Sequence, residues 1–471
     1  MTDLQLLDIL LTEFDETING EVNIDPLGLL VIWSSYGQDI FRHRISSISN
    51  DVRNYTLNLF NHAVIRSLIE DDSVVLGKGL RSDPAYIGIG GGKDSIAFKQ
   101  ACLIYLENAF TYAMIEAQSQ NNVETTGVLG ISKARRLWEK TQGNPRLLFS
   151  HESNAHVLVR QNLLGVSGRY KTPLVEMKFF DSAYDYALPK SRPQWDKVWA
   201  QFLTPSKPLA RLHKLVREHL TVLLTDERRI PERCFMDLPT ELKCAFVSAF
   251  RSPTVVGAYA RDFWLSITEL NQGASGALYE VLDQEWTSPD QRQVRPTADV
   301  FEQAANFSLP DSDKAKLEYV RLLEPFLAEL DLLLGVMLSA KSQSIDEAIA
   351  KWKSLGRDAR TLPDRAVPIE MHTAMRARIS GTAAGRLGEL LALAHGTDIQ
   401  HQMESLLRYH DKVMQARGQS PWLRLLGGKQ LKIDVRIRQL PTQDERPLGD
   451  WVHHYYLPQF RHLLSGLRGG V

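Results

Sequence analysis

The sequence predicts a mainly α-helical protein of several lobes with small β-hairpin or sheet elements. Three observations predict this. Along several segments the apolar residues recur at steps of three and four, which is the period of a helix with one buried face. The chain has 471 residues, which is too long for one ordinary core and favours two or three domains. Runs of β-prone or alternating residues are short and local, so we expect only small sheets.

The clearest helices lie in the first third of the chain. An apolar stripe begins at Val52, after the capping residues Asn50 and Asp51, and a second one runs from Phe98 to Met114. Helical spacing returns at residues 208–224, 238–250 and 255–270.

The last third predicts further helices with explicit boundary signals. Residues 315–340 predict a long helix that Pro325 bends, and Ser344 with Glu347 forms a capping box for the next one. A helix over residues 398–417 should end at Gly418.

Two segments predict the small β elements. Residues 146–181 combine short β-prone runs, at 147–149 and 174–180, with glycine and proline. Residues 422–438 predict a hairpin with Gly427 and Gly428 in the turn, because apolar and polar residues alternate after it.

Composition shifts suggest the domain organisation. We expect an N-terminal helical domain with a glycine-rich loop at residues 1–145 and a mixed middle domain at residues 146–285. Residues 286–313, rich in Pro, Ser, Asp and Gln, should be a linker or surface crossing. Residues 314–471 should form a C-terminal helical domain with the hairpin.

Charge and cysteine content indicate the class of protein. The formal net charge is −1 and 44% of residues are hydrophobic, so a nucleic-acid contact must come from a local patch. Three cysteines (Cys102, Cys234 and Cys244) do not suggest a disulfide framework. The acidic, amphipathic N-terminus and the lack of long apolar runs favour a cytoplasmic location without a membrane partner.

The string Gly90-Gly-Gly-Lys-Asp-Ser95 is the strongest candidate for chemistry. It resembles the S-G-G-x-D-S loop of the ATP-pyrophosphatase (PP-loop) enzymes, although Gly90 replaces the first serine of that loop. The resemblance implies a nucleotide site in which Gly91, Gly92, Lys93 and Ser95 contact phosphates, with ATP and magnesium as cofactors. In the competing interpretation Asp94 caps a core helix and the glycines form a surface loop.

Two other motifs suggest metal chemistry. Glu176-Met-Lys178 resembles the E-x-K strand of PD-(D/E)xK nucleases, but charges on an edge strand explain the same pattern. His151 and His156 are five residues apart, a separation that turns the two rings away from each other on a helix. We therefore predict neither a metal site nor catalytic residues.

A basic segment is the main candidate for a binding surface. Its cations, interleaved with an aromatic residue, suit phosphate contacts and base stacking, although a solvated face or a docking surface for an acidic partner remains open. The residues are Lys133, Arg135, Arg136, Trp138, Lys140 and Arg146. A second basic stretch runs from Arg424 to Arg438 on the expected hairpin.

These observations together favour an interaction protein over an enzyme. We expect a non-catalytic scaffold subunit of a bacterial cytoplasmic multiprotein complex, in a phage-defence or DNA-processing setting, without a cofactor. Its partners would be other protein subunits, with nucleic acid at the basic segment. The alternative is a nucleotide-binding enzyme that uses the glycine loop.

Overall fold

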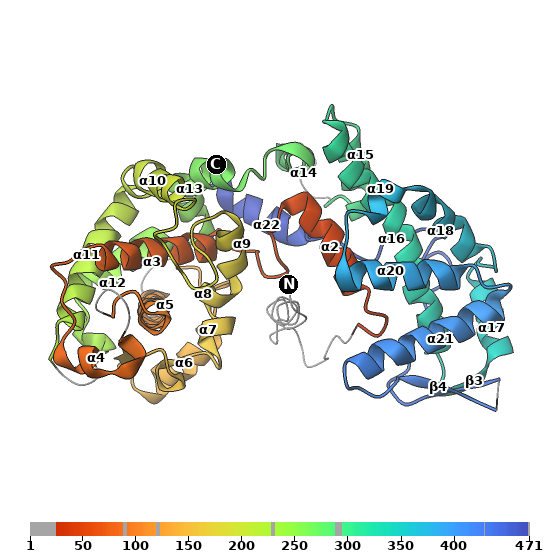
Figure 1. Cartoon of the computed structure of the whole chain (residues 1–471), viewed down its shortest axis with the longest axis horizontal. Coiled ribbons are helices and arrows are strands. Elements are labelled where there is room, and N and C mark those ends of the chain that lie inside the picture. The colour runs from red at the N-terminus through yellow and green to blue at the C-terminus, as the bar shows by residue number, and fades with distance from the viewer. Residues whose placement is uncertain are drawn as a thin grey trace. The chain divides into compact units, whose positions relative to one another are not determined.

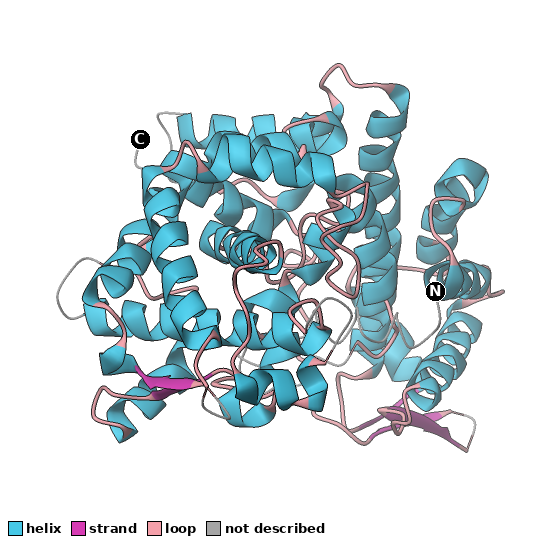
Figure 2. Cartoon of the chain, turned by 60° about the vertical axis from the view of Figure 1, so that its left-hand side comes forward, coloured by secondary structure: helices cyan, strands magenta, loops and turns pink. Residues whose placement is uncertain are grey.

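The computed structural model describes residues 25–87, 92–118, 123–227, 231–287, 294–427 and 429–469. Helices dominate these residues, and the strands form only two small antiparallel sheets (Figure 2). The predicted mainly α fold is therefore confirmed. None of the described helices is long and apolar enough to cross a lipid bilayer.

Contacts between Cα atoms divide the chain into two compact units. Among the described residues, unit 1 comprises His43–Glu269 and residues 458–469, and unit 2 comprises residues 25–42 and 270–457. The predicted boundaries at residues 145, 285 and 313 stay a prediction.

Unit 1 is built around two buried helices. Every residue of α3 from Val52 to Ile65, and every residue of α5 from Ala101 to Met114, is buried. Both α3 and α12 pack on α5 (Figure 1). The helices are α3 (Val52–Ile69), α4 (Lys78–Ser82), α5 (Ile96–Gln118), α6 (Ile131–Lys140), α7 (Gln161–Leu164), α8 (Val166–Arg169), α9 (Lys171–Glu176), α10 (Arg192–Lys197), α11 (Lys207–Leu224), α12 (Thr240–Phe250), α13 (Pro253–Thr268) and most of α22 (Leu457–Leu467), with a π-helical turn at Val198–Leu203 and 3₁₀ turns at Pro84–Tyr86, Ser153–Ala155 and Phe235–Asp237.

The predicted start of α3 is confirmed. Asp51 has an extended backbone, and its carboxylate accepts a hydrogen bond from the Arg53 N–H at 2.8 Å. Such a cap satisfies one of the N–H groups that the first helical turn leaves without a partner.

The β prediction for residues 146–181 is half right. Strand β1 (Arg146–Leu148) pairs antiparallel with β2 (Glu232–Cys234), a partner far along the chain. The expected strand over residues 174–180 is wrong, because this segment begins inside helix α9. Leu174 and Met177 are both buried, and their spacing of three places them on one face of a helical turn.

Unit 2 is organised around α16, which packs on α2, α14, α15, α17 and α18 (Figure 1). As predicted, Pro325 lies inside this long helix. The helices are α2 (Leu30–Phe41), α14 (Gly273–Thr287), α15 (Thr297–Ala305), α16 (Asp311–Met337), α17 (Ile345–Ser354), α18 (Thr361–Met371), α19 (Thr373–Arg376), α20 (Gly381–Ala394) and α21 (Ile399–Ala416).

The predicted hairpin of unit 2 is confirmed, and a third strand joins it. Strands β4 (Leu423–Leu426) and β5 (Gln430–Ile433) pair antiparallel, and Gly427 has the positive φ of 56° that favours glycine in such a turn. Gly428 lies outside the described residues. Strand β3 (Ser342–Ser344) pairs with the other edge of β5.

The local helix signals of unit 2 are also confirmed. Ser344 and Glu347 form both bonds of the capping box of α17. Asp398 caps α21 through the His401 N–H, and Gly418 follows its end with a φ of 65°. Short-range hydrogen bonds of this kind depend on neighbours in the sequence, which is why the sequence predicts them well.

The predicted linker contains a helix in its described part. Residues 288–293 lie outside the described residues, and α15 follows them with Val300 and Phe301 fully buried. Two buried apolar residues one after the other anchor this short helix to α14 and α16.

Candidate functional site

Helix α6 carries the basic segment and separates its residues into two groups. Lys133, Arg136 and Lys140 are all exposed. Their spacings of three and four residues place them along one face of the helix. Within the described ranges, none of the three side chains makes an ion pair or a hydrogen bond. These three cations therefore form an exposed row that is available to bind an anion.

The opposite face of α6 fixes the helix on unit 1. Ala134 is fully buried, and Trp138 packs on Tyr112 and Phe235 with ring centroids 6.2 and 5.3 Å apart. The helix begins after Gly130, whose φ of 78° favours glycine and which lies against the Leu158 side chain. Because its indole packs inward, Trp138 does not extend the row of cations.

The two remaining arginines of the basic segment have internal partners. Arg135 donates hydrogen bonds to Gln118 at 2.9 Å and to Thr125 at 2.6 Å. Arg146, on β1, pairs with Glu232 on the neighbouring strand β2. The structure therefore brings together three of the six residues that the sequence grouped.

The described part of the glycine loop lies beside α3. Gly90 and Gly91 are outside the described residues. Gly92 has a φ of 89°, and a Cβ there would lie 2.0 Å from the Tyr86 carbonyl oxygen, so this position requires glycine.

Lys93 reaches inward from this loop. Its ammonium donates hydrogen bonds to the carbonyl oxygens of Leu68 at 3.0 Å and Asp71 at 2.6 Å. Burial of the side chain lowers the pKa of Lys93. A lysine that binds the last carbonyl groups of a helix acts as a C-terminal cap, and here the capped helix is α3.

The neighbours of Lys93 are also bonded within the protein. The Ser95 hydroxyl donates to the Gly92 carbonyl and accepts from the Phe98 N–H, both at 3.1 Å. The Asp94 carboxylate pairs with Lys99 at 2.5 Å. These bonds give the loop a structural role at the start of α5, while its proposed binding of phosphate stays a prediction.

The two motifs that resemble metal sites do not have the expected local structure. Glu176 ends α9, and Lys178 follows it with a φ of 66°, so the E-x-K motif is not on a strand. His156 has its pKa lowered by burial, and its Nε2 lies 3.3 Å from the His151 carbonyl oxygen. Among the described residues, no group of three or more His, Cys, Asp or Glu side chains could hold a metal ion.

Buried carboxylates are the polar features that sequence reasoning missed. Glu324, fully buried on α16, accepts four hydrogen bonds. They come from the Val452 and His453 N–H groups, both at 2.8 Å, from the Trp33 indole at 2.7 Å and from the Tyr455 hydroxyl at 2.8 Å. Burial nevertheless raises its pKa to about 7.

Glu329, five residues further along α16, forms a buried ion pair. Both of its carboxylate oxygens accept from the Arg357 guanidinium at 3.0 Å, and both side chains have no exposed surface. The same arginine donates to the carbonyl oxygens of Leu355 and Pro447. The sequence signal was a pair of glutamates inside the apolar run of α16.

A third buried carboxylate, Glu107, lies on α5 in unit 1. It accepts from the Ser167 N–H at 2.7 Å and from the Gln161 amide at 3.1 Å. Burial raises its pKa to about 6. All three carboxylates bind segments distant in sequence to the central helices α5 and α16, so their partners belong to the fold.

A cavity of about 470 Å³ lies between α6 and β1, with Tyr112, Leu137, Arg146, His156 and Glu232 among its lining residues. Its charged lining residues Arg146 and Glu232 neutralise each other. It therefore offers little net attraction to an ion.

Comparisons of the chain with protein-family models, with curated proteins and with solved structures found no match in any of the three.

Proposed function

We propose that this protein is a non-catalytic interaction subunit of a multiprotein complex, and that it contacts nucleic acid through the exposed face of α6. The observation that carries the proposal is the row formed by Lys133, Arg136 and Lys140. Three exposed cations on one helix face, without ion pairs to the described residues, retain their full charge for a partner.

The spacing of this row favours a phosphate backbone. Seven residues of α-helix rise about 10 Å between Lys133 and Lys140, so the row is long enough to contact more than one phosphate of a DNA strand, which carries one charge per about 3.4 Å of duplex axis. Since Trp138 packs inward, base stacking adds nothing to this surface. Binding should therefore depend on charge and show little preference for sequence.

The non-catalytic part of the proposal is supported by the internal hydrogen bonds of the buried lysine and carboxylate side chains. Lys93 caps α3, and the carboxylates of Glu107, Glu324 and Glu329 hold backbone and side-chain donors of their own unit. A group that is committed to several internal bonds must break them before it can act on a substrate.

Binding of labelled double- and single-stranded DNA, measured by fluorescence anisotropy between about 50 and 200 mM salt, tests the interface. The variant K133Q/R136Q/K140Q should bind more weakly and lower the slope of log K against log salt by about 2 to 3.

A matched control uses the same loss of charge on another helix of unit 1. Lys207, Arg211 and Lys214 are exposed along one face of α11, where Lys214 pairs with Glu218. The variant K207Q/R211Q/K214Q should bind nearly as the wild type does. Equal losses in the two variants, or no binding by the wild type at low salt, would contradict the proposed interface.

The subunit role has its own test. The tagged protein is purified from its native cells, and the mass and composition of the purified species are measured. A stoichiometric protein partner supports the proposal, whereas a lone monomer or homo-oligomer would contradict it.

A further inference from the structure

The cavity between α6 and β1 combines an apolar wall with neutral hydrogen-bonding groups. Its volume is about 470 Å³, within the range of about 300 to 1,000 Å³ that is typical of small-molecule sites. The apolar wall comes from Leu137, Leu148, Ala155 and Val157, and the other lining residues are Tyr112, Arg146, Asn154, His156 and Glu232.

The ion pair of Arg146 and Glu232 is neutral as a whole but keeps free bonding atoms. The Arg146 Nη2 contacts the Glu232 Oε2, and both side chains reach solvent. Within the described ranges, neither side chain makes another hydrogen bond. The pair therefore still offers guanidinium N–H donors and a carboxylate oxygen as acceptor.

Asn154 and Tyr112 add two polar groups that the described residues leave without a bond. The Asn154 side chain is exposed, whereas the Tyr112 hydroxyl is buried at the wall of the cavity. Burial lowers the pKa of His156, and its two ring nitrogens lie 3.3 Å from the His151 carbonyl oxygen and 3.4 Å from the Gln161 N–H nitrogen. The lining thus has donors and acceptors but no net charge, which suits an uncharged polar ligand.

The cavity adjoins the helix face that carries the row of cations. Leu137 lines the cavity from α6. Lys133 lies four residues before Leu137 and Lys140 three residues after it, so both cations are its neighbours on the helix surface. A strand whose phosphates contact the row therefore passes next to the cavity.

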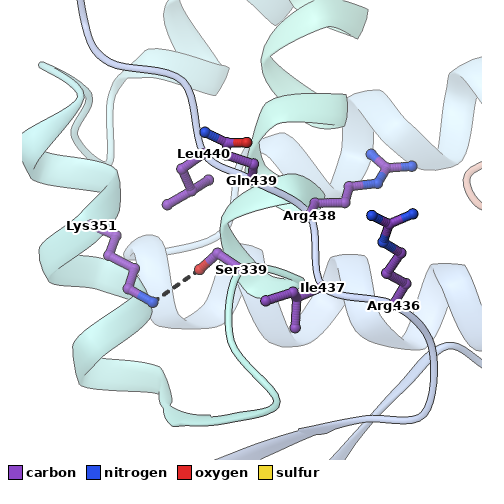
Figure 3. Close-up of a pocket in the computed structure, with 7 residues that line it drawn as sticks. All are labelled: Ser339, Lys351, Arg436, Ile437, Arg438, Gln439 and Leu440. Atoms are coloured by element: carbon purple, nitrogen blue, oxygen red, sulfur yellow. Dashed lines mark hydrogen bonds between the residues drawn. The ribbon is translucent and has the colours of Figure 1, made fainter.

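A larger cavity, of about 590 Å³ in unit 2, has a different character. Its Lys351 ammonium donates to the Ser339 hydroxyl at 2.9 Å (Figure 3). Arg438 pairs with Asp331 at 3.2 Å, and the guanidinium groups of Arg436 and Arg438 point away from Lys351 (Figure 3). The cations of that cavity do not converge on one ligand.

We propose that the cavity between α6 and β1 holds one unpaired base of a single-stranded nucleic acid whose phosphates contact the row on α6. A nucleobase is uncharged, presents donors and acceptors along its edge and has two apolar faces, which matches this lining. An unpaired base enters a pocket at less cost than a base in a duplex, which must first lose its pairing and stacking. This inference rests on the proposed nucleic-acid interface and adds the class of strand that the interface prefers.

Fluorescence anisotropy with three labelled single strands of about 12 nucleotides tests the proposal. One strand carries adenine, one carries thymine and one is abasic, so all three have the same phosphates. The wild type should bind at least one of the strands with bases about tenfold more tightly than the abasic strand, because a held base adds contacts that phosphates do not make.

Two variants and a matched control locate the base. L148W fills the cavity without a change of charge and should remove most of the tenfold difference. N154A removes an exposed amide without internal bonds and should reduce the difference about threefold, and it serves as the test if thermal melts show that L148W is unfolded. L163W adds the same indole at an exposed position of α7 outside the cavity, so it should keep the wild-type difference.

The outcomes separate this site from the row of cations. Equal affinity of the wild type for all three strands would overturn the cavity site and leave the row intact. A preference for bases that is unchanged in L148W and N154A would also overturn it, since the base would then lie elsewhere. The variant K133Q/R136Q/K140Q should weaken the binding of all three strands by the same factor. No binding of any strand at low salt would contradict the proposed interface itself.

Discussion

Helices α3 and α16 are largely buried helices of their respective units, yet their buried polar groups differ in how they are bonded. On α16, Glu324 and Glu329 have hydrogen-bond partners for both carboxylate oxygens. On α3, Asn58 and Asn61 are fully buried, and their side-chain atoms have no hydrogen-bond partner among the described residues.

This difference separates two roles for buried polarity. A buried polar group whose hydrogen bonds are all formed holds distant segments together. Removal of one partner lowers the free energy of unfolding, because the other partner stays buried without a bond. A buried group with no bonds lowers stability by its lost hydration. Changes at the bonded glutamates of α16 should therefore be much more harmful than changes at the unbonded asparagines of α3.

The largest effect should come from the buried ion pair of α16. R357M leaves the Glu329 carboxylate buried without its cation, and we expect the free energy of unfolding to fall by about 3 to 5 kcal/mol. Urea denaturation measures this loss. The double variant E329L/R357M should recover much of it, and a double variant as unstable as R357M would show that the cost is packing and not charge.

Replacement of Glu324 should have the next largest effect. An amide in E324Q has one oxygen for four donors, so two or more donors lose their acceptor and stability should fall by about 3 kcal/mol. The same urea experiment measures it. A loss below about 1 kcal/mol would mean that the four bonds contribute little and would remove the contrast with α3.

The pH dependence of stability also tests the role of the buried Glu324. Burial raises the pKa of Glu324 from 4.5 to about 7, so the folded protein holds a proton that the unfolded chain releases. The stability from this proton is complete below the ordinary pKa and is lost as pH rises through about 7.

The stability advantage of the wild type over E324Q should therefore shrink between about pH 5 and about pH 8. His453, whose pKa burial lowers from 6.5 to about 3, stays neutral in the folded state across this window. Its titration in the unfolded chain is the same in both proteins and cancels in the comparison. An advantage that is constant across the window would show that Glu324 is already ionised at the lower pH.

Lys93 should give a smaller effect at the end of α3. K93M removes the ammonium that binds the Leu68 and Asp71 carbonyl oxygens, and we expect a loss of about 1 to 2 kcal/mol. Thermal melts check this, with K78M on the exposed surface of α4 as a control. An unchanged melting temperature would show that these two bonds add no stability. The ammonium could then bind a phosphate instead, as the PP-loop resemblance implies.

The smallest effect should come from the unpartnered amides of α3. N58L replaces a buried amide with an apolar group of similar shape, so stability should stay the same or rise by up to about 1 kcal/mol. N54L is the matched control, because Asn54 donates to the Gly127 carbonyl oxygen and the Tyr170 hydroxyl. If N58L is as harmful as N54L, then Asn58 has a partner such as a bound water molecule.

Predictions from the sequence succeeded where the chemistry is local. The caps of Asp51, Ser344 and Asp398 form bonds to residues two or three positions away, and the hairpin of β4 and β5 closes within a few residues. Such contacts are set by neighbouring residues, so a single sequence contains the information.

The predictions failed where a segment depends on distant partners. Residues 174–180 have β-prone side chains, but packing of Leu174 and Met177 selects a helical turn. Strand β3 is too short to show a period and exists because β5 offers it an edge. The candidate site divides in the same way. The sequence located the basic segment, whereas the row of Lys133, Arg136 and Lys140 depends on helix α6, and the inward turn of Trp138 depends on Tyr112 and Phe235.

The sequence by itself determined the mainly helical class, the ends of several helices, the hairpin and the position of the basic segment. Periodicity and capping act over a few residues, and the chain encodes them directly. Only the tertiary structure decided that Lys93 caps α3 and that Glu324 and Arg357 are buried with their partners. These outcomes join residues far apart in the chain, because burial leaves a charged group no partner but the one that the fold brings to it.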